Sequence, residues 1–215
     1  MIRHLAVLAA LACAVPAFAQ QPAPPPATAP QAAPKPATAP KPAAPKPAQT
    51  VLPKGLDPEN TVFLDTKYGR IIIKLRPDIA PKHAERIKQL AREKFYDNVP
   101  FHRVIAGFMA QTGDGQYGNG TGGSKYPNLP AEFSSVPYTR GIVGMARTSD
   151  PNSANSQFFI MLADNSSLNN KYTVVGEVVS GMDVVDKIKK GPEAQNGAVT
   201  NPDKITRMQV AADAK

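Results

Sequence analysis

Proline is unevenly distributed along the chain, and its distribution limits where a folded core can form. More than half of the 23 prolines in this 215-residue chain lie between Gln21 and Pro53, among alanine, lysine, threonine and glutamine. This segment has no aromatic residue and almost no large aliphatic one, so it cannot bury enough apolar surface to offset the entropy lost on ordering. We therefore predict a disordered, polyproline-like tether over residues 20–55 and one globular domain over residues 56–212.

The first nineteen residues have the features of an export signal. A short basic region at residues 3–4 precedes an apolar run at residues 5–15 and an A-x-A cleavage pattern that ends at Ala19. The apolar run is too short to span a bilayer, so we predict a cleaved signal peptide over residues 1–19 and a periplasmic protein. An alternative is a lipoprotein anchored through Cys13, although the residues before this cysteine fit a lipidation signal poorly.

The formal charge of +8 is concentrated outside the predicted domain. Five of the 25 Lys and Arg residues precede residue 55, which leaves 20 basic against 17 acidic residues and a net charge of +3. Nucleic-acid binding requires clustered basic residues with interleaved aromatics, and the sequence has no such cluster. We predict neither nucleic-acid binding nor stable membrane insertion.

The domain sequence favours short strands over helices. Strand-like stretches cover residues 61–66, 70–76, 99–109 (kinked near Gly107), 141–146, 157–162, 172–179 and 204–211. A short helix is expected over residues 182–190. Seven or eight strands with two helices and no regular βα alternation favour an antiparallel sheet that is closed or nearly closed into a barrel.

The clearest helix signal follows the second strand. Asp78 is expected to cap this helix, and Pro81 suits its first turn. Ala84, Ile87, Ala91 and Phe95 fall on one face at helical spacing, and the charged residues Lys82, Lys88 and Arg92 fall elsewhere.

Several kinds of chemistry are excluded by the residues that remain after cleavage. Only two histidines, His83 and His102, and no cysteine would be left, so a zinc site with the usual ligands is not possible. The chain lacks a G-x-S-x-G motif, which argues against an α/β-hydrolase. Residues 113–118 match G-x-G-x-x-G, but no helix follows to supply the anion-binding N-terminus, so we interpret them as a structural loop. We predict no metal and no cofactor.

Two segments carry polar residues inside otherwise apolar stretches. The first is Phe-His-Arg-Val-Ile-Ala-Gly-Phe-Met-Ala-Gln at residues 101–111, and the second is Ala-Asn-Ser-Gln-Phe-Phe-Ile at residues 154–160. Gln157 and Phe159 are two residues apart and share one strand face. From periodicity alone, each segment is either core with an incidental polar residue or part of a site.

Together these motifs resemble those of the cyclophilins. Residues 101–111, Asn-Gly-Thr-Gly-Gly at 119–123 and Ser-Gln-Phe-Phe-Ile at 156–160 have the order and spacing of that family, and the resemblance runs from about Thr61 to Val210. It implies a mainly β fold, an eight-stranded antiparallel barrel capped by two α-helices, with a shallow groove on its outer face. It also implies a monomeric peptidyl-prolyl cis-trans isomerase that acts on proline-containing polypeptides and assists the folding of unfolded exported proteins.

The resemblance also implies roles for individual residues. Arg103 is expected to donate a hydrogen bond to the prolyl nitrogen, Gln111 to orient Arg103, and His102 either to flank the arginine or to be a satisfied buried histidine. The implied substrate-binding residues are Phe108, Met109, Phe159 and Leu168 in an apolar pocket, Ala146, Arg147 and Gln157 beside the residue that precedes proline, Tyr172 at the rim, and the loop 118–123 along the edge.

Some positions depart from the family pattern, and other functions stay open. Ser167 stands where the family often has an aromatic residue, and Arg147 where it often has Asn. One alternative is a chaperone module that binds proline-containing segments without catalysis. Another is an interaction protein that uses residues 21–53 as a ligand.

Overall fold

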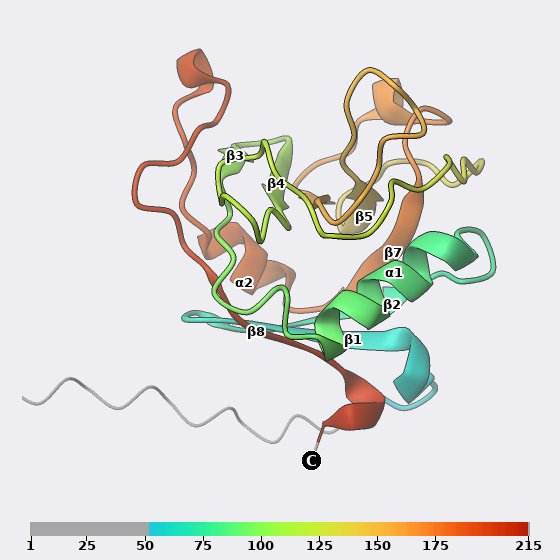
Figure 1. Cartoon of the computed structure of the whole chain (residues 1–215). Coiled ribbons are helices and arrows are strands. Elements are labelled where there is room, and N and C mark those ends of the chain that lie inside the picture. Colours follow the sequence, from blue (N-terminus) through green and yellow to red (C-terminus); the bar gives the residue numbers. More distant parts are fainter. Residues whose placement is uncertain (1–51, 215) are drawn as a thin grey trace, which may run out of the picture. The chain divides into compact units, whose positions relative to one another are not determined.

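A computed structural model describes residues 52–214 of the chain (Figure 1). The predicted signal peptide and the predicted tether up to Val51 lie outside the described residues. The strands are β1 (Thr61–Thr66), β2 (Gly69–Leu75), β3 (Arg103–Ile105), β4 (Met109–Thr112), β5 (Ile142–Met145), β6 (Phe158–Met161), β7 (Val174–Ser180) and β8 (Ile205–Val210). The helices are α1 (Pro81–Arg92) and α2 (Met182–Lys187), with short 3₁₀ turns η1 (Pro58–Asn60), η2 (Ser166–Leu168), η3 (Glu193–Gln195) and η4 (Ala211–Asp213). In this part of the chain, no helix has the length and apolar character needed to cross a membrane.

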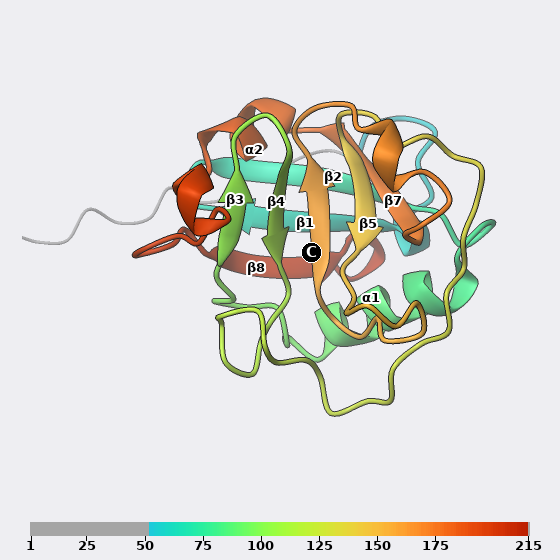
Figure 2. The ribbon, with the colours of Figure 1, turned by 90° about the horizontal axis from the view of Figure 1, so that it is seen from above.

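The eight strands form one antiparallel sheet in the order β3-β4-β6-β5-β7-β2-β1-β8. The sheet curls on itself, so that β3, β4 and β5 cross over β1, β2 and β8 (Figure 2). Helices α1 and α2 lie near opposite sides of the curled sheet, α1 against β8 and α2 against β2. The prediction of a mainly β fold with eight antiparallel strands and two helices is confirmed.

The sheet is a half-barrel, more open than the eight-stranded barrel that the resemblance implied. Its end strands β3 and β8 do not pair along their lengths. The residues just before them make the connection instead, since the Phe101 N–H donates to the Asp203 carbonyl (2.8 Å) and the Ile205 N–H to the Val99 carbonyl (2.9 Å). Because β3 has only three residues and its outer edge is paired with the loop 191–199, no length of strand is left for closure.

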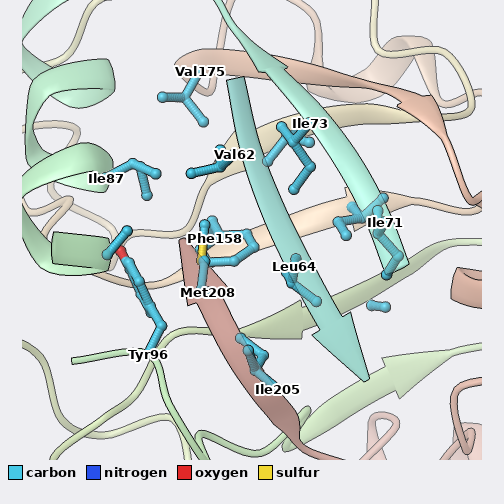
Figure 3. Packing of buried hydrophobic residues seen from close by; sticks show 14 of the residues in the cluster. Val62, Leu64, Ile71, Ile73, Ile87, Tyr96, Phe158, Val175, Ile205 and Met208 are labelled. Carbon is cyan, nitrogen blue, oxygen red and sulfur yellow. The ribbon is translucent and has the colours of Figure 1, made fainter. Parts of the chain in front are cut away.

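Side chains that alternate along the strands make two separate apolar clusters. Val62, Leu64 and Ile73 point into the interior, where they pack with Phe158 and with Ile87 of α1 (Figure 3). Each fully buried aliphatic side chain contributes about 1.5–3 kcal/mol to stability. The other face of β4 and β6 carries a second cluster, which includes Met109, Phe159 and Met161. Side chains alternate between the two faces of β4 and β6, so these adjacent strands also form an apolar surface outside the half-barrel.

The N-terminus of α1 is capped differently from the prediction. Pro81 begins the helix as predicted, but Asp78 does not cap it, because its carboxylate pairs with Arg76 (Nη2–Oδ2 2.7 Å). The carboxylate of Glu132, from a distant loop, instead accepts from the N–H groups of Lys82 (3.3 Å) and His83 (3.2 Å). A negative charge at this end also suits the helix dipole.

The stretch 99–109 is not one kinked strand as predicted. It contains β3 and a tight turn that leads into β4, and the Phe108 N–H donates to the Ile105 carbonyl (3.1 Å). Gly107 lies in this turn with a φ of 69°, a left-handed conformation that glycine adopts without strain. The segment is therefore a β-hairpin, and its register places residues 103 and 111 opposite each other.

Candidate active site

The β3–β4 hairpin brings Arg103 and Gln111 together. The two residues are direct cross-strand partners, and Arg103 Nη1 donates to Gln111 Oε1 (3.2 Å). Gln111 Nε2 in turn donates to Gln157 Oε1 (3.0 Å). Arg103 and Gln111 are thus in contact, and side-chain amide hydrogen bonds extend from the arginine to Gln157, the residue just before β6.

Asn196 holds the other side of the Arg103 guanidinium, and sequence reasoning missed it. Arg103 Nε donates to the backbone carbonyl of Asn196 (3.0 Å), and Nη2 donates to its Oδ1 (2.8 Å). Burial lowers the pKa of Arg103, yet arginine stays protonated in proteins. Within residues 52–214 no carboxylate pairs with this guanidinium, so its positive charge is not neutralised. The Asn-Gly pair at 196–197, a typical turn signal, was the only hint in the sequence.

Most residues predicted to form the apolar pocket pack together in the second cluster, outside the half-barrel. Its members from the predicted set are Phe108, Met109, Ala146, Phe159, Leu168 and Tyr172. The ring of Phe159 stacks on Tyr138 (centroids 5.8 Å apart) and meets Tyr172 edge-on (5.8 Å). Tyr138 is an additional member that sequence reasoning did not identify. The Phe159 ring is thus held from two sides, and its orientation is fixed.

Arg147 acts through its side chain as well as its backbone. Its guanidinium donates to the carbonyls of Thr148 (Nη1, 2.8 Å) and Lys171 (Nη2, 2.8 Å) and lies over the Tyr172 ring, 4.5 Å from the centroid. These contacts join the loops on both sides of the groove. The backbone just before Arg147 is held as well, since the Ala146 N–H donates to the carbonyl of Gln157 (2.9 Å).

A polar cleft of about 340 Å³ adjoins this apolar pocket. It is lined by Gln111, the segment Gly120–Ser124, Asn128, Ala146, Arg147, Thr148, Ser153, Asn155 and Gln157. Gln157 Nε2 donates to the carbonyls of Gly120 (2.9 Å) and Gly122 (2.8 Å), so its side chain is fixed against the loop. The loop 118–123 thus lies along the groove, as the resemblance implied.

Asp114 organises the glycine-rich loop. Its carboxylate accepts from the backbone N–H groups of Gln116, Tyr117, Asn119, Gly120 and Gly122. Burial alone would raise the pKa of Asp114, but these hydrogen bonds outweigh it and lower the pKa to about 2. The N–H groups that could have held a phosphate are already bound to Asp114, which supports the interpretation of residues 113–118 as a structural loop.

His102 lies beside this loop rather than in the cleft. Its side chain is buried and packs so closely on Gly120 that a Cβ there would lie 2.9 Å from Nε2. By the geometric criteria for a hydrogen bond, neither ring nitrogen has a partner among the described residues. Burial lowers the pKa of His102, which favours the neutral ring. A catalytic role for His102 stays a prediction.

Comparisons with known proteins agree on one family. The family model of cyclophilin type peptidyl-prolyl cis-trans isomerases matches residues 61–210. A probable peptidyl-prolyl cis-trans isomerase of Brucella suis is 63% identical over 169 residues, which cover 74% of this chain and 86% of that protein. Peptidyl-prolyl cis-trans isomerase B of Escherichia coli is 42% identical over 144 residues, with 63% and 88% covered.

Solved structures give the same result. A cyclophilin from Hirschia baltica matches with a TM-score of 0.67 and 28% identity, and the match covers 74% of this chain and 77% of that one. A Cryptosporidium parvum cyclophilin type isomerase, crystallised in the presence of the dipeptide Ala-Pro, matches with a TM-score of 0.64 and 28% identity over 70% and 98% of the two chains.

Proposed function

Because the chain belongs to the cyclophilin family of peptidyl-prolyl cis-trans isomerases, we propose that it isomerises X–Pro bonds of exported polypeptides in the groove beside Arg103. We use the word groove for the polar cleft together with the adjoining apolar cluster. One observation supports its assignment as the active site. A guanidinium with no carboxylate partner in the described domain is fixed by neutral acceptors beside an apolar cluster that contains Met109 and Phe159.

The reaction requires a group that recognises a twisted amide. The X–Pro bond has a small trans preference but a rotation barrier of about 18–20 kcal/mol, which resonance between the carbonyl and the prolyl nitrogen maintains. On twisting, the nitrogen becomes pyramidal and gains a lone pair that can accept a hydrogen bond. A donor that meets this lone pair binds the transition state more tightly than the planar ground state, and so it accelerates rotation.

Arg103 meets this requirement in the proposed mechanism. The proline ring lies on Phe159 and Met109, and Arg103 donates to the prolyl nitrogen as the bond twists. Gln111 keeps the guanidinium in place from one side. The Cryptosporidium parvum cyclophilin crystallised with Ala-Pro supports the proposal that such a pocket receives a proline residue.

The polar cleft takes the residues that precede proline. Ala146 belongs to both the cleft and the apolar cluster, and Gln157 lines the cleft with its side chain fixed against the loop, so we place the residue before proline beside these two. The cleft is lined largely by polar side chains and backbone, so it suits short polar side chains of the substrate better than large apolar ones.

We place this activity in the periplasm, with unfolded exported proteins as substrates and assistance to folding as the result. The signal peptide predicted for residues 1–19 and the tether predicted for residues 20–55 support this location. The test of the function is an isomerisation assay on a short Ala-Pro peptide, followed by exchange between its cis and trans NMR signals. Catalysed exchange supports the proposal, whereas peptide binding without exchange would favour the non-catalytic chaperone module.

The tether is expected to be dispensable for the chemistry. A truncated chain of residues 55–215 should isomerise a free peptide as fast as the chain without its signal peptide, because all the groove residues lie after residue 100. The comparison of kcat/KM for the two proteins checks this prediction. A loss of more than about fivefold on truncation would contradict it.

Cyclosporin, a cyclic and largely apolar peptide that occupies the groove of this family, is expected to inhibit weakly. Ser167 is exposed beside Leu168, and its hydroxyl donates to Asn165 Oδ1 (2.6 Å), so it offers little apolar surface to the drug. In Ser167→Trp the added ring should tighten inhibition about tenfold while peptide turnover stays within twofold. Drug titration into the isomerase assay measures both. Tight inhibition of the unmodified protein would refute this explanation.

A further inference from the structure

Arg103 has three of its donors fixed before any substrate binds. An arginine carries five N–H groups. Nε and one N–H of Nη2 donate to the two oxygens of Asn196, and one N–H of Nη1 donates to Gln111. Asn196 therefore holds one complete edge of the guanidinium, and two N–H groups remain to meet a substrate.

The loop after α2 is built to present Asn196 in this position. Asn196 adopts a left-handed conformation (φ 52°, ψ 33°) at the end of η3, where its N–H donates to the Glu193 carbonyl (2.8 Å). The next residue, Gly197, accepts from the Val104 N–H (2.8 Å), and a Cβ at Gly197 would collide with Ile105. The loop is thus paired with β3 on either side of Arg103, which sets the distance between Asn196 and the guanidinium.

The acceptors around Arg103 are all uncharged. Two amide side chains and one backbone carbonyl fix its orientation, and no carboxylate in residues 52–214 competes for its charge. Neutral acceptors restrict the guanidinium without pairing its charge, so the full charge stays directed at the groove.

We infer that Asn196 is a positioning residue for catalysis, which aligns Arg103 through a neutral two-oxygen contact and leaves its charge free for the twisted X–Pro bond. This inference rests on the proposed function of Arg103. Since the donor matters only once the amide twists, misalignment should lower kcat and leave KM almost unchanged.

The main test is Asn196→Gly. Glycine tolerates the left-handed conformation and keeps the backbone acceptor, but it removes Oδ1. We expect kcat to fall about fivefold to tenfold, with KM within twofold of the original protein and the same thermal midpoint. The matched control is Asn201→Gly, since Asn201 is also an exposed left-handed asparagine (φ 52°) in the same loop region but has no recorded contact with Arg103. Its kcat should not change.

A second variant, Asn196→Asp, keeps the shape and the acceptor but adds a charge. An ion pair would neutralise the Arg103 donor, so kcat should again fall by at least fivefold. The inference is overturned if Asn196→Gly turns over within twofold of the original protein, or if Asn196→Asp is as fast or faster. An inactive original protein would instead overturn the proposed function, and the loss of activity in Arg103→Ala shows that the assay reports on this site.

Discussion

Arg103→Ala is expected to lower kcat by about 10²–10³-fold, comparable with the loss of one pre-organised donor in other active sites. The substitution removes the guanidinium that meets the pyramidal nitrogen, while the apolar pocket that grips proline is left intact. Substrate affinity should therefore change much less than turnover. Exchange of an Ala-Pro peptide, measured by NMR at saturating peptide, gives kcat directly.

Lysine at the same position provides the control. Arg103→Lys keeps the positive charge but lacks the rigid fork that Asn196 and Gln111 hold in place, so it should recover little of the lost rate. Circular dichroism should show both variants folded, because the side chain of Arg103 lies outside the interior cluster. A folded Arg103→Ala protein with near-normal turnover would mean that catalysis does not depend on this donor.

Asp114→Asn is expected to lower the free energy of unfolding by about 3 kcal/mol at pH 7. Asparagine keeps one acceptor oxygen and turns an NH₂ group toward backbone N–H donors, so at least two of the five hydrogen bonds are lost in a buried site. Urea denaturation of the two proteins measures the difference. The control is Asp150→Asn, because Asp150 is exposed and its side chain accepts a single hydrogen bond, from the Asn152 N–H (2.8 Å). It should cost less than about 1 kcal/mol.

The same carboxylate makes stability depend on pH in a defined direction. The pKa of Asp114 is about 2 in the folded protein and 3.8 for the ordinary group, so the stabilisation is complete above about pH 4 and is lost as the pH falls toward 2. A shift of this size corresponds to about 2.5 kcal/mol. The difference between the original protein and Asp114→Asn should therefore shrink between pH 4 and pH 2. A difference that stays constant over this range would show that the charge on Asp114 is not what stabilises the loop.

Local patterns in the sequence were sufficient for most of the fold. The strand β2 follows from its run of three β-branched isoleucines, and the first turn of α1 follows from Pro81, which fixes a helical φ. The hairpin at Gly107 was mistaken for a kink, because the pattern of apolar residues is the same whether the strand continues or the chain reverses. The cap of α1 was also missed, since Glu132 is some fifty residues away in sequence and only tertiary folding brings it to the helix.

Some residues of the candidate site could likewise be predicted from the sequence, whereas others could not. Arg103, Gln111 and Phe159 lie in motifs that resemble a known family, so their proximity could be anticipated. Asn196 contacts Arg103 across 93 positions of sequence, and the Asn-Gly pair at 196–197 indicates a turn but not what the turn contacts. The side-chain contacts of Arg147 could not be predicted either, because they depend on the position of the Lys171 loop in the folded protein.

The pairing of the loop 191–199 with β3 has a consequence for how the protein releases its substrates (Figure 2). An unfolded polypeptide readily adds itself as an extra strand wherever a sheet offers a free edge. Beside Arg103 that edge is already occupied, since the N–H and carbonyl of Val104 are bonded to Gly197 and Gly191. A client chain in the groove next to β3 must then be held through side chains and a few polar contacts, without a continuous ladder of main-chain hydrogen bonds. Without such a ladder, fewer main-chain hydrogen bonds have to break when a substrate leaves the groove.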